Sequence, residues 1–262
     1  MSMQAVTDLF KNSELDAALQ EVQTVIKNDP TDQVYRLAYA EILCIQGDLE
    51  RADKQLEVVV KQAPKNVMEL LTWRQLIRAE QKRQDWYNEG AVPTFLEKNE
   101  RLETLLKVGV ELRDKNISEA EKLIASLEQT RPTVEVLYGD GQQASQLRDL
   151  DDMCSDFVEV LTSKGEYYWI TFDQLLSIEF EEPQRFLDTI WRRATIHTTT
   201  GIDGVVFIPA IYAKSESVSE KMGKSTDWIA ISENLYCGKG QKIWLFGEQD
   251  IPIMELTSLT FS

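Results

Sequence analysis

The feature that most constrains the fold is a repeat in the first half of the chain. The segments "SELDAALQEVQTVIKNDPTD" and "GDLERADKQLEVVVKQAPKN" align at an offset of 34 residues. A 34-residue period that is built from helix pairs is typical of tetratricopeptide repeats. A third match lies three periods after the first and contains Ile117, Ala120, Ile124 and Pro132. The aligned pairs are Leu15 with Leu49, Ala18 with Ala52, Val22 with Leu56, Val25 with Val59, Lys27 with Lys61, and Pro30 with Pro64.

Each part of this repeat has a physical role. The small alanine lets two helices cross closely, and the proline ends the second helix because it cannot continue the hydrogen-bond ladder. The intervening period is degenerate, and we interpret residues 69–90 as one helix and 94–116 as a longer one. The pattern predicts a tetratricopeptide-like domain over residues 1–132, with about seven helices in three to four hairpins that pack only against their neighbours. A helical bundle without superhelical curvature is the alternative.

Helical repeats of this kind commonly hold a peptide on their concave face. Aromatic and arginine side chains are frequent anchors at such interfaces, so we take five residues of the first helices as a candidate groove. For each of them, ordinary packing between helices or solvation is the competing interpretation. The candidate groove residues are Tyr35, Arg36, Tyr39, Trp73 and Arg74.

The pattern changes after Pro132. The segments "TVEVLYG", "GEYYWITF", "GVVFIPAIYA", "QKIWLFGEQD" and "IPIMELTSLTF" are rich in β-branched and aromatic residues, which indicates strands. Short helices or strand-plus-turn units lie between them, without long alternating helices. Residues 133–262 are therefore predicted to form an antiparallel, partly barrelled α+β domain. Most of its four tryptophans are expected in the core.

Composition excludes several classes of function. The formal charge is −16, and residues 133–262 alone carry 21 acidic and 10 basic side chains. This field repels nucleic acid and anionic membrane, and favours a basic partner surface. No apolar run reaches the ~18 residues of a membrane span, and no secretory leader is evident, so we expect a cytoplasmic protein. Cys44, Cys154 and Cys237 are scattered and are expected to be buried free thiols.

The acidic stretch "GDGQQASQLRDLDD", residues 139–152, is the main candidate for chemistry. We interpret "GDG" as a tight turn, and Asp149, Asp151 or Asp152 as the N-terminus of a helix, where carboxylates accept free backbone N–H groups. The alternative is a metal-dependent hydrolase that uses Asp140 with these three aspartates. His197, the single histidine, has no nucleophile-elbow serine or cysteine near it in sequence. We therefore predict no catalytic residue, metal or cofactor.

The order of segments through the whole chain resembles the ImpE family, whose members are also called TagJ or SciE-type proteins. The resemblance implies a non-enzymatic adaptor of a bacterial type VI secretion system. It further implies binding of the N-terminal helix of the small sheath subunit, and a link to the AAA+ ATPase that recycles the sheath. The domain that holds the helix is left open. In the second domain, the family pattern implies that Arg148 pairs with a carboxylate. The family-motif positions are Gly141, Arg148, Asp149, Asp151, Asp152, Trp169, Trp191, Arg192, Asp227 and Trp228.

Overall fold

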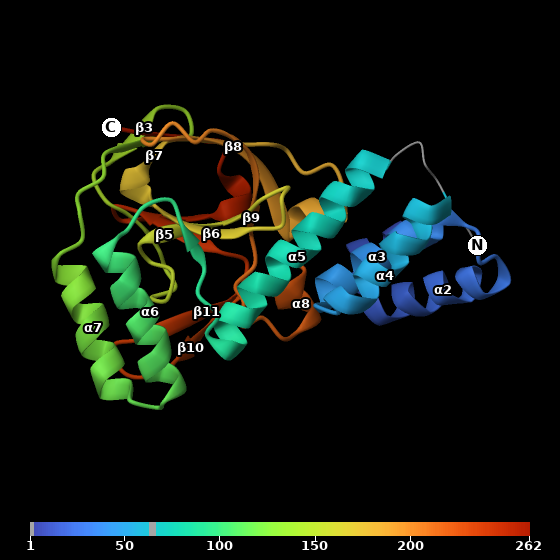
Figure 1. The fold of residues 1–262 in the computed structure, drawn as a ribbon, viewed down its shortest axis with the longest axis horizontal. Coiled ribbons are helices and arrows are strands. Elements are labelled where there is room, and N and C mark those ends of the chain that lie inside the picture. Colours follow the sequence, from blue (N-terminus) through green and yellow to red (C-terminus); the bar gives the residue numbers. More distant parts are fainter. Residues whose placement is uncertain (1–2, 63–66) are drawn as a thin grey trace.

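Most helices come first along the chain and most strands follow, as predicted. The structure, a computed structural model, describes residues 3–62 and 67–262, and Figure 1 shows the arrangement. Within these residues, seven helices precede Pro132. They are α1 (Met3–Lys11), α2 (Leu15–Asn28), α3 (Gln33–Gln46), α4 (Leu49–Gln62), α5 (Val67–Glu89), α6 (Glu100–Arg113) and α7 (Ile117–Gln129).

The repeat signature corresponds to the second helices of the hairpins. Ala18 in α2, Ala52 in α4 and Ala120 in α7 are fully buried where the paired helices cross. Pro30 follows the end of α2, as predicted, whereas Pro64 lies outside the described residues. Local signals define the boundaries as well. Asp32 accepts the N–H of Tyr35 at 3.1 Å and caps α3, and α3 ends at Gly47, whose φ is +85°.

The prediction of one long helix over residues 94–116 is wrong. Thr94 and Phe95 form β1 (Thr94–Phe95), which pairs in parallel with Tyr168 and Trp169. The helix α6 begins only at Glu100, because the side chain of Asn99 accepts the N–H groups of the first turn. The connection from α5 to α6 therefore supplies an edge strand to the sheet. As a result, α6 and α7 lie beside the α+β part, and α5 separates them from α2–α4 (Figure 1).

The second half is built mainly on antiparallel pairs. Nine strands follow the order β1-β6-β5-β9-β8-β7-β14-β2-β3, and β1–β6 is the parallel pair. Two small sheets, β10-β11 and β13-β12-β4, complete this part. The predicted multidomain α and α+β fold is confirmed. The strands are β2 (Val136–Tyr138), β3 (Gln142–Ala144), β4 (Leu147–Asp149), β5 (Phe157–Leu161), β6 (Tyr167–Thr171), β7 (Leu175–Phe180), β8 (Trp191–Thr198), β9 (Gly204–Pro209), β10 (Thr226–Ala230), β11 (Tyr236–Gly240), β12 (Ile243–Phe246), β13 (Gln249–Pro252) and β14 (Ser258–Phe261).

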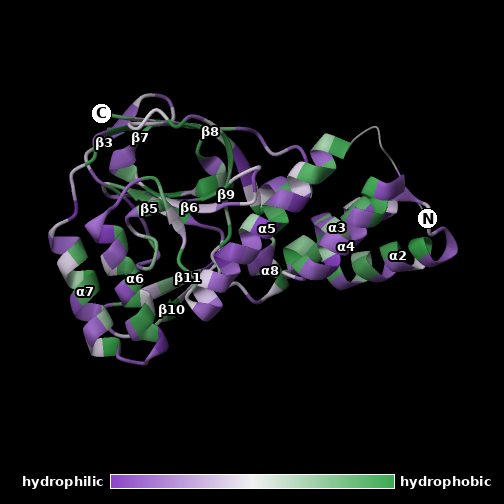
Figure 2. Cartoon of the chain, in the orientation of Figure 1, coloured by the Kyte–Doolittle hydropathy of each residue, from purple (hydrophilic) through white to green (hydrophobic). Residues whose placement is uncertain are grey.

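The short helices complete the second half. They are the 3₁₀ helices η2 (Phe172–Gln174), η3 (Phe186–Thr189) and η4 (Ile253–Glu255), and the single-turn helix α8 (Val218–Lys221). Across residues 3–62 and 67–262, no helix combines the length and the apolar character that crossing a bilayer requires. Figure 2 shows hydrophobic residues along the strands and in stripes on the helices.

One hydrophobic core joins the helices to the sheet. Trp86 of α5 meets Trp169 of β6 edge to face at 4.9 Å, and Phe157 of β5 stacks on the same ring at 4.1 Å. At the other end, Phe10 of α1 stacks on Phe186 of η3 at 4.4 Å. The expectation that each hairpin packs only against its neighbours is therefore wrong. The helices bury apolar surface against the sheet as well as against one another.

Candidate functional site

A network of buried charges lies where α5 crosses β5. Glu159 of β5 is fully buried and accepts two hydrogen bonds from the Arg83 guanidinium, from Nε at 2.8 Å and from Nη2 at 3.0 Å. Arg83 also donates to the Ile211 carbonyl at 2.9 Å and to Glu80 at 3.2 Å. The Trp191 indole donates to the second oxygen of Glu80 at 3.1 Å. These bonds satisfy two buried carboxylates from one arginine and tie the helix to the sheet.

Lys242 extends the network into the small sheet. Its ammonium lies 3.0 Å from Glu159 and 3.2 Å from Asp149, and all three side chains are buried. Asp149 also accepts from the Tyr212 hydroxyl at 2.7 Å and from the Trp244 indole at 3.1 Å. Every charge in this group has a partner of opposite sign, which is the condition under which buried charges are tolerated.

The pKa values follow from these contacts. Burial alone raises the pKa of Glu159, but the positive charges of Arg83 and Lys242 and the hydrogen bond from Tyr167 hold it well below its ordinary value. Asp151 behaves in the opposite way. Burial, reinforced by the nearby charge of Asp149, raises its pKa to about 7. Glu159 is therefore a permanent anion of the folded protein, whereas Asp151 takes up a proton near neutral pH.

The acidic stretch does not begin a helix, so that prediction is wrong. Asp149 ends β4, Asp151 and Asp152 lie in turns, and the apolar run that follows forms the buried strand β5. The carboxylates still accept backbone N–H groups, but in turn geometry. Asp149 accepts from Asp151 at 2.9 Å, and Asp151 accepts from Met153 at 2.8 Å and from Gly238 at 2.9 Å. Residues 157–161 form a strand instead of a helix because the sheet buries both of their faces.

The contacts of the four aspartates argue against the hydrolase alternative. Asp140 is exposed in the turn of the β2–β3 hairpin, while Asp149, Asp151 and Asp152 are buried. Asp152 accepts from Arg148 at 2.6 Å and from the Tyr236 N–H at 2.7 Å. The predicted pairing of Arg148 with a carboxylate is thus present. Lysine, arginine, hydroxyl and backbone donors occupy the buried carboxylates. Within the described ranges, no cluster of histidine, cysteine and acidic side chains suits a metal ion.

The remaining family-motif residues have mixed environments. Trp169, Trp191 and Arg192 are buried, and Arg192 donates to the Ile253 carbonyl and lies over the Phe180 ring at 4.6 Å. Gly141 occupies the hairpin turn with φ of +90°. On β10, Asp227 accepts the N–H of its neighbour Trp228 at 2.8 Å, and Trp228 is 37% exposed.

Four of the five candidate groove residues mainly hold the helices together. Tyr35 and Tyr39 are buried, and Arg36 donates to the Pro30 carbonyl at 2.7 Å. Arg74 forms a two-point ion pair with Asp53, at 2.6 and 2.8 Å. Trp73, the fifth, is buried on α5, where the Arg185 guanidinium lies 5.4 Å from its ring, and it also contributes to a surface hollow.

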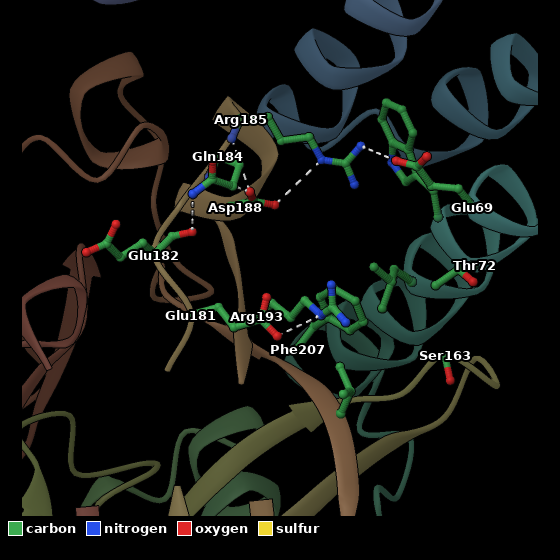
Figure 3. A pocket seen from close by; sticks show the side chains of 13 residues that line it. Glu69, Thr72, Ser163, Glu181, Glu182, Gln184, Arg185, Asp188, Arg193 and Phe207 are labelled. Carbon is green, nitrogen blue, oxygen red and sulfur yellow. Dashed lines mark hydrogen bonds and ion pairs between the residues drawn. The ribbon is translucent and has the colours of Figure 1, made fainter. Parts of the chain in front are cut away.

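This hollow lies between α5 and the α+β part (Figure 3) and has a volume of about 570 Å³. One wall is the face of α5 that carries Glu69 and Thr72. The opposite side comes from the segment after β7, and Arg193 and Phe207 come from β8 and β9. Figure 3 shows acidic and basic side chains together around it. The full lining is Glu69, Thr72, Trp73, Leu76, Ser163, Glu181, Glu182, Gln184, Arg185, Asp188, Arg193, Val205 and Phe207.

The sequence did not predict that Arg83 and Lys242, the positive charges around Glu159, are buried. Arg83 sits in a helix rich in charged residues, and Lys242 directly precedes a strand, so both resemble surface residues in sequence. It also missed Asp156, which pairs with Arg101 and Arg131 and so fastens α6 to the turn before β5. A faint signal existed for the anions, because Glu159 interrupts the otherwise apolar run "FVEVL".

Helices α1–α5 form a helical arm, and buried ion pairs fix this arm to a mainly antiparallel sheet. This combination defines a two-part class of protein. Comparisons with known proteins then show which proteins the chain resembles. Residues 141–260 match the family described as "ImpE protein", which confirms the resemblance predicted from the sequence.

Two relatives extend the likeness to the whole chain. The type VI secretion system accessory component TagJ of Pseudomonas aeruginosa is 23% identical over 258 residues, which cover 97% of this chain and 90% of that protein. The crystal structure of protein VPA1032 from Vibrio parahaemolyticus matches with a TM-score of 0.93 and 28% identity. That match covers 98% of this chain and 97% of the other. Both matches thus span the helices and the sheet of this chain.

Proposed function

We propose that the protein is a cytoplasmic, non-enzymatic adaptor of a bacterial type VI secretion system. In this role it binds the N-terminal helix of the small sheath subunit and is linked to the AAA+ ATPase that recycles contracted sheath. The observation that carries the proposal is the likeness to the TagJ accessory component over 97% of the chain, together with the ImpE match.

The chemistry of the buried network supports a binding role over a catalytic one. Its carboxylates accept from Arg83, Lys242, Tyr212 and backbone N–H groups, and they are buried beneath the helices and the sheet. A general base or metal ligand must reach a substrate, and side chains saturated by internal donors do not. We assign this network to holding the arm at a fixed angle to the sheet.

The candidate groove of Tyr35, Arg36, Tyr39, Trp73 and Arg74 remains part of the proposal, with Trp73 as the member that also lines the hollow. Formal charge of −16 favours a basic partner and speeds the encounter by electrostatic steering. Association with the partner is therefore expected to slow as the salt concentration rises.

Calorimetric titration with a peptide of the sheath subunit's N-terminal helix tests the proposal. We expect binding with a Kd of about 1 μM or tighter, equivalent to about −8 kcal/mol. A scrambled peptide of the same composition is the control. Absence of heat with the native peptide, or equal binding of the scrambled one, would refute the adaptor role.

A further inference from the structure

The small sheet β10-β11 has a long edge. In Figure 1 it lies below the nine-stranded sheet, and β10 pairs with β11 alone. β10 has five residues, whereas the edge strands of the other two sheets, β1, β3, β4 and β13, have two to four. An edge strand presents a row of backbone N–H and C=O groups with which a further strand can pair. Whether β10 accepts such a strand depends on which of these groups already have partners.

The ladder between β10 and β11 shows which groups point outward. At one end Gln241 donates to the Ser225 carbonyl at 3.0 Å, and at the other end Ile231 donates to the Leu235 carbonyl at 2.9 Å. Hydrogen-bonded and non-hydrogen-bonded pairs alternate along an antiparallel ladder. Odd-numbered residues of the two strands therefore bond to each other, and even-numbered residues point their N–H and C=O groups outward.

The outer edge of β11 is closed by other segments of the same chain. Its three outward N–H groups all donate to side chains. Two of these side chains belong to the acidic stretch that precedes β5, which therefore covers this edge. The bonds are Tyr236 N–H to Asp152 at 2.7 Å, Gly238 N–H to Asp151 at 2.9 Å and Gly240 N–H to Ser215 at 2.7 Å.

The outer edge of β10 is open by comparison. Trp228 donates its N–H to the carboxylate of its neighbour Asp227 at 2.8 Å. For the outward N–H groups of Thr226 and Ala230, residues 3–62 and 67–262 provide no acceptor. Asp227, Trp228 and Ala230 are exposed, so another chain can reach this edge. Its free groups recur every second residue, which is the spacing that an added strand requires.

Two exposed aromatic side chains form a ledge beside this edge. Trp228 is 37% exposed and Tyr236 is 42% exposed. They lie on the same face of the sheet, because Trp228 is opposite Gly238 and side chains alternate along β11. The Tyr212 ring packs 5.8 Å from the Trp228 ring, and a Cβ at Gly238 would lie 2.3 Å from that tyrosine. The glycine thus makes room for the ring that supports Trp228, and an apolar side chain of an added strand gains free energy on this ledge.

The charge at the edge selects a basic segment. Lys239 lies opposite Asp227 on β11, but it pairs with Glu216 at 2.7 Å. In the part of the chain that the structure describes, Asp227 has no ion-pair partner. An added strand with lysine or arginine supplies one. Two copies joined through β10 would instead bring together two Asp227 carboxylates and two chains of charge −16, which disfavours a second copy as the occupant.

We propose that β10 binds an extended, basic segment of a partner protein, which adds to the sheet as a third strand. The N–H groups of Thr226 and Ala230 donate to carbonyls of this segment. A lysine or arginine of the segment pairs with Asp227, which frees the Trp228 N–H for a third carbonyl. An apolar side chain packs on Trp228 and Tyr236. The inference goes beyond the proposed function, since it concerns a second surface and an extended segment instead of a helix, and it does not depend on the sheath subunit.

Two labelled peptides test the chemistry by fluorescence anisotropy with the full-length protein. Both have about seven residues, the length of an ordinary strand, and alternate valine with either lysine or glutamate. We expect the lysine peptide to bind at least about tenfold more tightly at low salt. N-methylation of one alternate set of its amide nitrogens should weaken binding by at least about tenfold, and methylation of the other set by about twofold or less, because only one edge of the peptide faces β10.

Variants of the protein locate the site. Ala230→Pro removes an outward N–H and none of the bonds to β11, and Ala230→Val keeps the N–H and is the matched control. We expect the proline to weaken binding of the lysine peptide at least about tenfold and the valine about twofold or less. Asp227→Lys should weaken it by about tenfold, whereas Asp250→Lys, at an exposed aspartate of β13, should not. If circular dichroism shows that the proline variant is unfolded, Asp227→Lys and the methylated peptides decide.

Several results would overturn the inference. They are no binding of the lysine peptide, equal binding of the two peptides, equal effects of the two methylation patterns, and equal losses in a variant and its control. Sedimentation of the protein alone tests the second copy as occupant. A dimer that Ala230→Pro abolishes would overturn the assignment to a partner protein, and a wild-type monomer supports it.

Discussion

Removing the Arg83 side chain tests the central ion network most directly. Arg83→Ala deletes two hydrogen bonds to Glu159, one to Glu80 and one to the Ile211 carbonyl. Both carboxylates then stay buried, and Glu159 keeps only Lys242, at 3.0 Å, as a cationic partner. Breaking a buried ion pair on one side costs about 3 to 5 kcal/mol. We expect a loss of that size in the free energy of unfolding.

Urea unfolding followed by tryptophan fluorescence measures this loss. Arg74→Ala is the comparison, because the Arg74–Asp53 pair is partly exposed and is expected to contribute about 1 kcal/mol or less. In Arg83→Met combined with Glu159→Leu, apolar side chains replace the pair, and we expect stability to be partly recovered relative to Arg83→Ala. A loss below about 1 kcal/mol for Arg83→Ala, no larger than for Arg74→Ala, would refute the reasoning.

Two further predictions concern the helices. Burial raises the pKa of Glu41 from 4.5 to about 7, so the free energy of unfolding falls as the pH rises between these values. Glu41→Gln should therefore be more stable than wild type at pH 8, by up to about 3 kcal/mol, but not at pH 4. Urea unfolding at the two pH values measures this difference. A pH-independent difference would contradict this. Gly109→Ala places a Cβ 2.5 Å from the Trp86 side chain. We expect this close contact to destabilise the protein by about 1–3 kcal/mol and to lower the Tm, although alanine favours the helix. A higher Tm would contradict this prediction.

The parts of the fold that depend on neighbouring residues were predictable. The buried alanines Ala18 and Ala52 and the 34-residue period give helix pairs because helix formation and capping are local. The start of α6 was not predictable in this way. Its position depends on Thr94 and Phe95 pairing with β6, a strand more than 70 residues away in the chain.

In the candidate site too, contacts between residues close in sequence were predictable and long-range contacts were not. Turn chemistry around Gly141 and the pairing of Arg148 with Asp152 involve short separations and could be inferred. The contact between Arg83 and Glu159 spans 76 residues, and nothing in the sequence of a helix with three arginines indicates which of them is buried. The hollow is likewise assembled from α5, β8 and β9, so no single segment predicts it.

The long separation between Arg83 and Glu159 has a consequence for how the protein is made. At about 5 to 20 residues per second, the ribosome needs about 4 to 15 s to add the 76 residues from Arg83 to Glu159. Throughout that time α5 carries an arginine without its main counterion, and Lys242 is synthesised later still. The ion network that fixes α5 to the sheet can therefore be complete only after Lys242 has been added.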